Sequence, residues 1–169
     1  MGKWVLLAYR MPREPSRPRI AVWRKLERLG VARLGDGLVA LPADARTQEQ
    51  LEWVAEEVTD NGGSAQLWLA TPGSAAQERG IAQDMRAARA AEYDAVTAEA
   101  VAVSGGAEIE RTRAVRRLRA ELHRIGRRDF FPPPQRDVAR ASVRSLGASL
   151  DGAADGDGGD VSVNGGGRG

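Results

Sequence analysis

The chain has 169 residues, of which 42% are hydrophobic and 28% are charged, and its formal net charge is +2. The absence of cysteine excludes disulfide bonds, thiolate metal sites and cysteine nucleophiles. No apolar run approaches the roughly 18 to 20 residues that a membrane helix needs, and no signal peptide is recognisable. We therefore expect a soluble, cytoplasmic protein that does not bind membranes.

The small net charge conceals a strong segregation of sign along the sequence. Residues 1–40 hold nine basic and three acidic side chains, a balance of +6, whereas residues 44–60 hold one and six, a balance of −5. Residues 107–128 hold eight arginines against three glutamates, a balance of +5. The distribution of charge is therefore more informative about partners than the total.

Residues 1–72 predict one compact domain. Apolar runs typical of strands alternate with amphipathic patterns typical of helices. The segments, in chain order, are strand 3–9, helix 16–30, strand 31–34, strand 38–41, helix 47–60 and strand 64–70. We expect Ser16 to cap the first helix, and Thr47 to begin the second in a capping box with Gln50.

This order of elements predicts an α+β fold of the ferredoxin-like βαββαβ type. Right-handed crossovers place both helices on one face of a four-stranded antiparallel sheet, with the first and third strands in the centre. The first strand is apolar on both sides, so the second face of the sheet must also be covered. Either the C-terminal helices or a second subunit could provide that cover.

Residues 73–146 predict a helical extension that packs on this domain. An alanine-rich helix over 74–103 and an arginine-rich helix over 107–126 suggest a helical hairpin, and a short helix over 137–146 follows. Residues 147–169 are rich in glycine and aspartate, and we expect a disordered tail there.

Catalytic constellations are scarce in this sequence. His123 is the only histidine, and it lies on the arginine-rich helix without an acid or nucleophile at a helpful spacing. The glutamates of the second helix lie on its solvent side without carboxylates from another element. We expect no enzymatic activity, no catalytic residues, no metal and no cofactor.

A cluster of arginines near the start of the first helix is a candidate anion-binding site. It consists of Arg13, Arg17 and Arg19. Guanidinium groups beside the positive end of a helix dipole suit phosphate or another tetrahedral oxyanion. The alternative is that one or more of them pairs with Glu14 or with an acid of the second helix.

Two basic helix surfaces are candidates for contact with DNA phosphates. The predicted residues are Arg24, Lys25 and Arg28 on the first helix and Arg113, Arg117 and Arg124 on the arginine-rich helix, with Arg116, Arg127 and Arg128 nearby. The alternative is an ordinary charged surface, partly neutralised on the first helix by the acidic second helix. The four tryptophans fall in or beside apolar stripes, which favours core or interface packing over base stacking.

Several motifs resemble the N-terminal domain of the ChrB family, the chromate-resistance regulators of bacterial chromate operons. The most specific is the run Pro12-Arg13-Glu14-Pro15-Ser16-Arg17 followed by Val22-Trp23-Arg24. The other matching segments are 4–11, 21–26, 41–42, 49–53, 62–63 and 129–131. The resemblance covers about residues 3–146 and does not extend to the separate chromate-resistance domain that forms the second half of full-length members.

This resemblance implies transcriptional control of chromate efflux genes, with DNA binding and a response to the chromate oxyanion. Our leading hypothesis is therefore a ChrB-like regulatory protein that binds DNA as a homodimer, with chromate or another oxyanion as a candidate effector. Two alternatives remain open. One is a non-enzymatic protein-interaction or dimerisation module, and the other is an oxyanion-binding protein that uses Arg13, Arg17 and Arg19.

Overall fold

The computed structural model describes residues 2–154 as two compact units. Of the described residues, the sheet unit contains those up to Glu92 together with residues 124–134, and the helical unit contains residues 93–123 and 135–154. The sheet unit therefore extends beyond residue 72 and includes about the first two-thirds of a long helix, together with a later segment.

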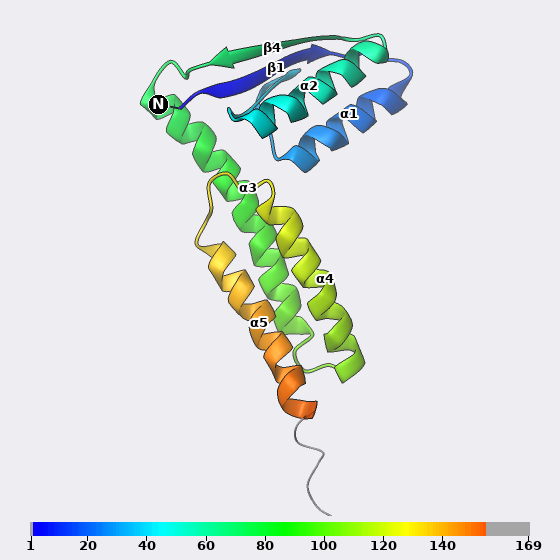
Figure 1. Ribbon diagram of the computed structural model, residues 1–169, viewed down its shortest axis with the longest axis vertical. Coiled ribbons are helices and arrows are strands. Elements are labelled where there is room, and N and C mark those ends of the chain that lie inside the picture. Colours follow the sequence, from blue (N-terminus) through cyan, green and yellow to red (C-terminus); the bar gives the residue numbers. More distant parts are fainter. Residues whose placement is uncertain (1, 155–169) are drawn as a thin grey trace, which may run out of the picture. The chain divides into compact units, whose positions relative to one another are not determined.

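The protein has mixed α and β structure, and the described residues form four strands and five helices (Figure 1). The elements are β1 (Trp4–Arg10), α1 (Ser16–Leu29), β2 (Ala32–Gly35), β3 (Leu38–Pro42), α2 (Ala45–Asp60), β4 (Ser64–Ala70), α3 (Ala75–Ala102), α4 (Glu108–Gly126) and α5 (Gln135–Ala154). None of the helices in this part of the chain is long and apolar enough to cross a bilayer.

The sheet is antiparallel throughout, with the strand order β2-β3-β1-β4. The first and third strands are central, as the sequence predicts. Leu6 lies opposite Ala40 of β3 on one side and opposite Trp68 of β4 on the other. β4 is therefore one edge of the sheet, and it pairs with β1 along all seven of its residues.

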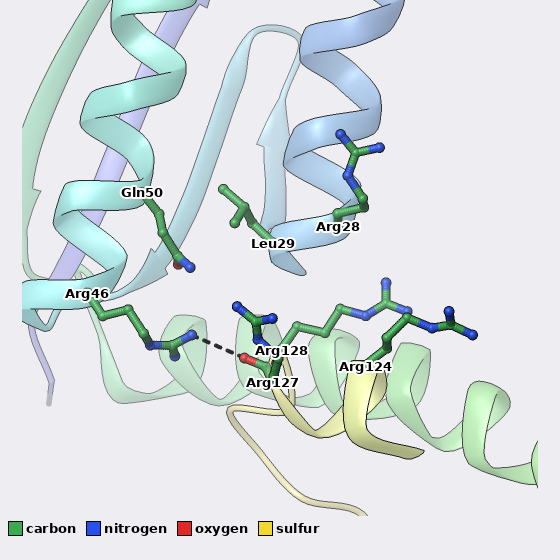
Figure 2. Close-up of a pocket in the computed structure, with 7 residues that line it drawn as sticks. All are labelled: Arg28, Leu29, Arg46, Gln50, Arg124, Arg127 and Arg128. Atoms are coloured by element: carbon green, nitrogen blue, oxygen red, sulfur yellow. Dashed lines mark hydrogen bonds between the residues drawn. The ribbon is translucent and has the colours of Figure 1, made fainter. Parts of the chain in front are cut away.

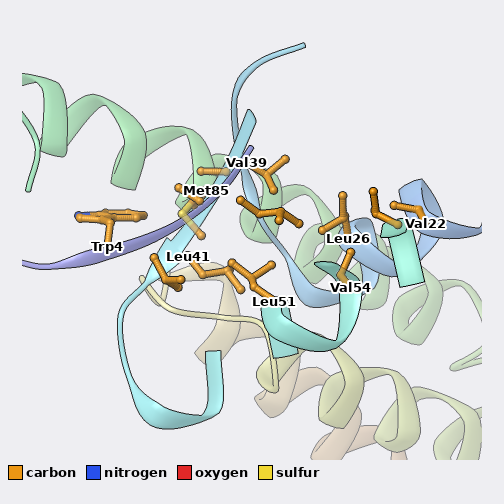
Figure 3. Close-up of a cluster of buried hydrophobic side chains, with 13 residues drawn as sticks. Trp4, Val22, Leu26, Val39, Leu41, Leu51, Val54 and Met85 are labelled. Atoms are coloured by element: carbon orange, nitrogen blue, oxygen red, sulfur yellow. The ribbon is translucent and has the colours of Figure 1, made fainter. Parts of the chain in front are cut away.

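Helices α1 and α2 lie on one side of the sheet (Figure 1) and bury their apolar stripes against it. Leu26 and Leu51 are fully buried with β-strand residues such as Val39 (Figure 3). Burial of a side chain of this size stabilises the fold by roughly 1.5–3 kcal/mol. These contacts hold both helices against the sheet.

The second face of the sheet is partly covered by the chain itself. Trp4, which alternates with the helix-facing Val5, is 3% exposed and donates a hydrogen bond from Nε1 to Glu78 of α3 at 3.2 Å. Met85 of α3 joins the same core, and Phe131 stacks on Trp4 with ring centroids 6.0 Å apart. Other apolar residues of the sheet stay exposed.

Both predicted helix starts need correction. α1 begins at Ser16 itself and its N-cap is Pro15, because the φ of −69° and ψ of 149° at Pro15 turn the chain one residue earlier than expected. α2 begins at Ala45 with Asp44 as its N-cap. Thr47 is the third residue of the helix and completes the capping box with Asp44, so Gln50 takes no part in it.

The helical unit contains the last third of α3, most of α4, and α5. Its core consists of residues from these helices: Tyr93, Val96, Ala100, Ala114, Val115, Leu118, Ala139, Val143 and Leu146. α4 and α5 are also joined by a hydrogen bond from Arg111 Nη1 to Ser149 Oγ at 3.2 Å. α5 thus joins α3 and α4, the two helices of the predicted hairpin, in this unit.

The last helix is longer than predicted. It starts at Gln135 and continues to Ala154, so residues 147–154 of the predicted tail are helical. The apolar stripe that contains the buried Val143 and Leu146 continues to the half-buried Leu150. Packing of this stripe favours a helix more than Gly147 disfavours it. The rest of the predicted disordered tail, residues 155–169, lies outside the described residues.

Candidate anion-binding pocket

A pocket of about 350 Å³ in the sheet unit is lined by five arginines (Figure 2). We call it the arginine pocket, and its residues are Arg28, Leu29, Arg46, Gln50, Arg124, Arg127 and Arg128. No acidic side chain of the described residues lines it. Like charges around one recess repel one another, and a bound anion would remove that repulsion.

The end of α1 supplies Arg28 and Leu29. The helix ends at Gly30, whose φ of 74° is easy for glycine and costly for other residues. A Cβ atom at Gly30 would lie 2.8 Å from the Cβ of Arg128 and 3.1 Å from its carbonyl oxygen. The missing side chain therefore lets the segment that carries Arg127 and Arg128 approach the end of α1.

The start of α2 supplies Arg46 and Gln50, which are one helical turn apart. Asp44 Oδ1 accepts a hydrogen bond from the backbone N–H of Thr47 at 2.7 Å, and this bond lowers the pKa of Asp44 below its ordinary value. Thr47 is fully buried and donates from Oγ1 to the carbonyl oxygen of Pro42 at 2.6 Å. The first turn of α2, and with it Arg46, is thereby tied to the end of β3.

The end of α4 and the residues after it supply Arg124, Arg127 and Arg128. Ile125 is completely buried, and the segment from Arg124 to Pro134 belongs to the sheet unit. α4 stops at Gly126, and the backbone N–H of Arg128 donates to the carbonyl oxygen of Ile125 at 3.1 Å. The turn after the helix thus places arginines on both sides of Gly126 at the same pocket.

Two of the five guanidinium groups are held in place by backbone carbonyl oxygens. Arg46 Nη1 donates to the carbonyl oxygen of Arg127 at 3.2 Å, and its guanidinium carbon lies 5.6 Å from the ring centre of Phe130. Arg128 donates from Nη1 to the carbonyl oxygen of Glu27 at 3.3 Å and pairs with the Glu92 carboxylate at 3.1 Å. The carbonyl oxygen orients the Arg46 guanidinium without cancelling its charge, whereas the Glu92 carboxylate offsets part of the charge of Arg128.

The guanidinium groups of Arg28 and Arg127 are the available ones. Within residues 2–154, neither makes a side-chain hydrogen bond or an ion pair, and both residues are exposed. A guanidinium group can bind two oxygens of a phosphate or similar oxyanion at once. The oriented Arg46 guanidinium beside the two available ones forms an arrangement that suits a multiply charged oxyanion.

The predicted DNA-contacting residues divide between the two units. Arg28 and Arg124 come together in the arginine pocket, and Arg24 is exposed on α1. Lys25 forms an ion pair with Glu57 of α2. This pair agrees with the expectation that the acidic second helix partly neutralises the positive charge of the first. In the helical unit, Arg117 pairs with Glu99, and Arg113 lines a shallow hollow with Arg116.

The predicted anion site at the start of α1 is less concentrated. Arg13 lies in the loop before the helix, and Arg17 and Arg19 lie near its start. An open hollow is lined by Arg13 and Arg19 together with Glu14, and Arg17 is not part of its lining. The carboxylate in this hollow reduces its attraction for an anion.

Arg46 is the pocket residue that sequence reasoning did not anticipate. It is the single basic residue of an acidic stretch, so the local charge pattern points away from it. One signal was available in the sequence. Arg46 lies in the first turn of a helix, where the helix dipole disfavours a positive charge, so a cation there suggests a role in binding. Among the described residues, no three acidic, histidine or cysteine side chains come together as metal ligands.

Fold and pocket together define a mixed α and β protein with an electropositive recess between the ends of α1 and α4 and the start of α2. Residues 19–156 match the family model described as Protein ChrB, N-terminal. The chain belongs to this family, which links it to chromate resistance, and all seven pocket residues fall inside the match. Comparison with curated proteins and with solved structures finds no match.

Proposed function

We propose that this ChrB-family chain is a non-enzymatic regulatory protein that binds DNA, and that the arginine pocket holds a phosphate of the DNA backbone. The observation that carries the proposal is the convergence of five arginines on one recess without an acidic residue in its lining. We also propose that the sheet unit is ferredoxin-like, since it combines a βαββαβ order with central first and third strands.

Phosphate contacts supply most of the sequence-independent affinity of proteins for DNA. Arg28 and Arg127 offer unpaired guanidinium groups, and each hydrogen bond to a charged oxygen contributes roughly 1.5–3 kcal/mol. Arg24 lies one helical turn before Arg28 on the same side of α1 and extends the positive surface beyond the pocket. A duplex that places one phosphate in the pocket would therefore also meet α1.

The test compares two variants that each remove positive charge from exposed arginines. The double variant Arg28→Ala/Arg127→Ala removes the two unpaired pocket cations, and Arg79→Ala removes an exposed arginine of the same unit outside the pocket. We expect the double variant to weaken binding to any duplex and to reduce the salt slope of log K by about 0.9 for each phosphate that the protein no longer neutralises. If it binds like Arg79→Ala in affinity and slope, the pocket does not contact DNA.

A second candidate function is binding of a free tetrahedral oxyanion such as chromate. The observation that favours it is the concave shape, because arginines from three separate elements surround the pocket (Figure 2). Calorimetric titration with chromate, sulfate and phosphate separates the two functions. Saturable binding of a free oxyanion that Arg28→Ala/Arg127→Ala abolishes supports an effector pocket, and the absence of heat with all three anions rejects it.

A further inference from the structure

β4 is an open edge of the sheet. It pairs with β1 on one side, and no strand of the described residues pairs with its other side (Figure 1). An unpaired edge presents a row of backbone N–H and C=O groups that a further strand can bind. The edge is seven residues long, about 23 Å, which is long for an unprotected strand.

The two edges of this sheet differ in how they are protected. β2, the opposite edge, has four residues, contains Arg33 and is interrupted by an irregularity between Arg33 and Gly35. Short length, charge and bulges are the usual devices that prevent a sheet edge from pairing with another chain. β4 has none of them, since its sequence Ser-Ala-Gln-Leu-Trp-Leu-Ala contains no charge and no proline and its register with β1 is regular.

Large apolar side chains flank the open edge on both faces of the sheet. Trp68 is 57% exposed and Leu69 is 62% exposed. Successive side chains of a strand point to opposite faces, so these two residues leave apolar surface on each side of the edge. A strand added beside β4 would cover both.

We propose that β4 is a dimer interface, at which two copies of this chain pair their β4 strands antiparallel and form one continuous sheet. Antiparallel pairing around a two-fold axis places the strand against itself, so each copy satisfies the other's free backbone groups. The register that uses all seven residues is centred on Leu67. It places Trp68 opposite Gln66 of the second copy and Leu69 opposite its Ala65, a large residue against a smaller one on each face.

A second copy fits this edge better than an unrelated peptide of another chemistry. The strand carries no charge that could select an acidic or basic segment, whereas its neutral sequence complements itself. α2 packs against β4 and has an acidic outer stripe of Glu49, Glu52, Glu56 and Asp60. Pairing brings two such stripes toward each other, so we expect association to strengthen as salt screens their repulsion.

The test is analytical ultracentrifugation of the full chain over a range of concentrations, at low salt and at about 0.5 M salt. The variant Trp68→Lys/Leu69→Lys places two charges beside the edge at positions that are already exposed. The control is Ile20→Lys, which replaces an apolar residue of α1 that is 45% exposed and lies away from β4. Circular dichroism establishes that each variant is folded.

We expect a dimer for the wild type and for Ile20→Lys, a monomer for Trp68→Lys/Leu69→Lys, and tighter association at the higher salt. A monomeric wild type at every concentration, or a dimer that survives both lysines, would overturn the proposal. The proposal does not depend on DNA binding. Arg28→Ala/Arg127→Ala should remain dimeric, and DNA affinity falls with salt whereas dimer affinity rises.

Discussion

Arg46 donates a hydrogen bond from its Nη1 atom to the backbone carbonyl oxygen of Arg127, 3.2 Å away, and so joins the start of α2 to the segment that follows α4 (Figure 2). Two cationic residues are thereby fixed side by side at one recess. The contact orients the Arg46 guanidinium, and a carbonyl oxygen does not neutralise its charge. A protein that needed only packing at this position would gain from a neutral side chain, so the arrangement favours a role in binding an anion.

The first prediction concerns Arg46. We expect Arg46→Ala to change the free energy of unfolding by less than about 1 kcal/mol, because removal of the hydrogen bond is offset by reduced repulsion among the remaining arginines. Binding of an oxyanion should weaken clearly. Thermal denaturation with and without sulfate measures both effects, since a ligand of the folded state raises Tm more when it binds more tightly.

Arg46→Lys is the matched control, because lysine keeps the charge but lacks the planar fork that binds two oxygens. We expect it to retain part of the sulfate-induced rise in Tm. An equal rise in the wild type and in Arg46→Ala would show that this residue takes no part in anion binding.

The second prediction concerns the cap of α2. Asp44→Ala removes the acceptor of the Thr47 backbone N–H and should lower the free energy of unfolding by about 0.5–2 kcal/mol. Asp44→Asn keeps a capping acceptor and should cost less. Urea denaturation of the three proteins at neutral pH measures the difference, and equal stabilities would contradict the role of this cap.

The third prediction follows from the lowered pKa of Asp44, which arises first from the backbone hydrogen bond of Thr47. A carboxyl whose folded pKa lies below its unfolded value stabilises the protein above the unfolded pKa, about 3.9. That contribution is lost as pH falls through the lowered folded pKa. We therefore expect the stability of Asp44→Asn to fall less than that of the wild type between about pH 5 and pH 2, measured by urea denaturation.

The fourth prediction concerns the close approach at the end of α1. Gly30→Ala forces a side chain into a positive φ and against Arg128, so we expect a loss of more than about 1 kcal/mol in the free energy of unfolding. Gly80→Ala is the matched control, because Gly80 lies within α3 with open space around its Cα. There the same change should stabilise the protein by about 0.5–1 kcal/mol. Equal effects at the two positions would contradict this account of Gly30.

Much of the fold could be predicted because its signals are local. Apolar periodicity locates the strands and helices, and Gly30 marks the end of α1 as expected. Helix starts were harder, because Asp44 and Thr47 are both good caps and only the folded chain shows which one takes the role. The length of α5 depends on the packing of Leu146 and Leu150. The glycines nearby in the sequence favour a disordered tail instead and so hide this signal.

The arginine pocket could be predicted only in part. Arg28 and Arg124 are recognisable as members of two basic helices, but nothing in their spacing indicates that they share a recess. That convergence depends on the lack of a side chain at Gly30, which lets Arg128 approach the end of α1. Arg46 stays hidden in the sequence because its neighbours are acidic and its contact with Arg127 is long-range.

The most direct test of the central claim is a fluorescence-anisotropy titration of the wild-type protein with the DNA upstream of its own gene and with a scrambled duplex. The titrations are made at low and at physiological salt, with and without chromate. We predict tighter binding to the upstream DNA, a steep loss of affinity with salt, and release by chromate. Equal, weak binding to both duplexes that physiological salt abolishes would contradict a regulatory DNA-binding function.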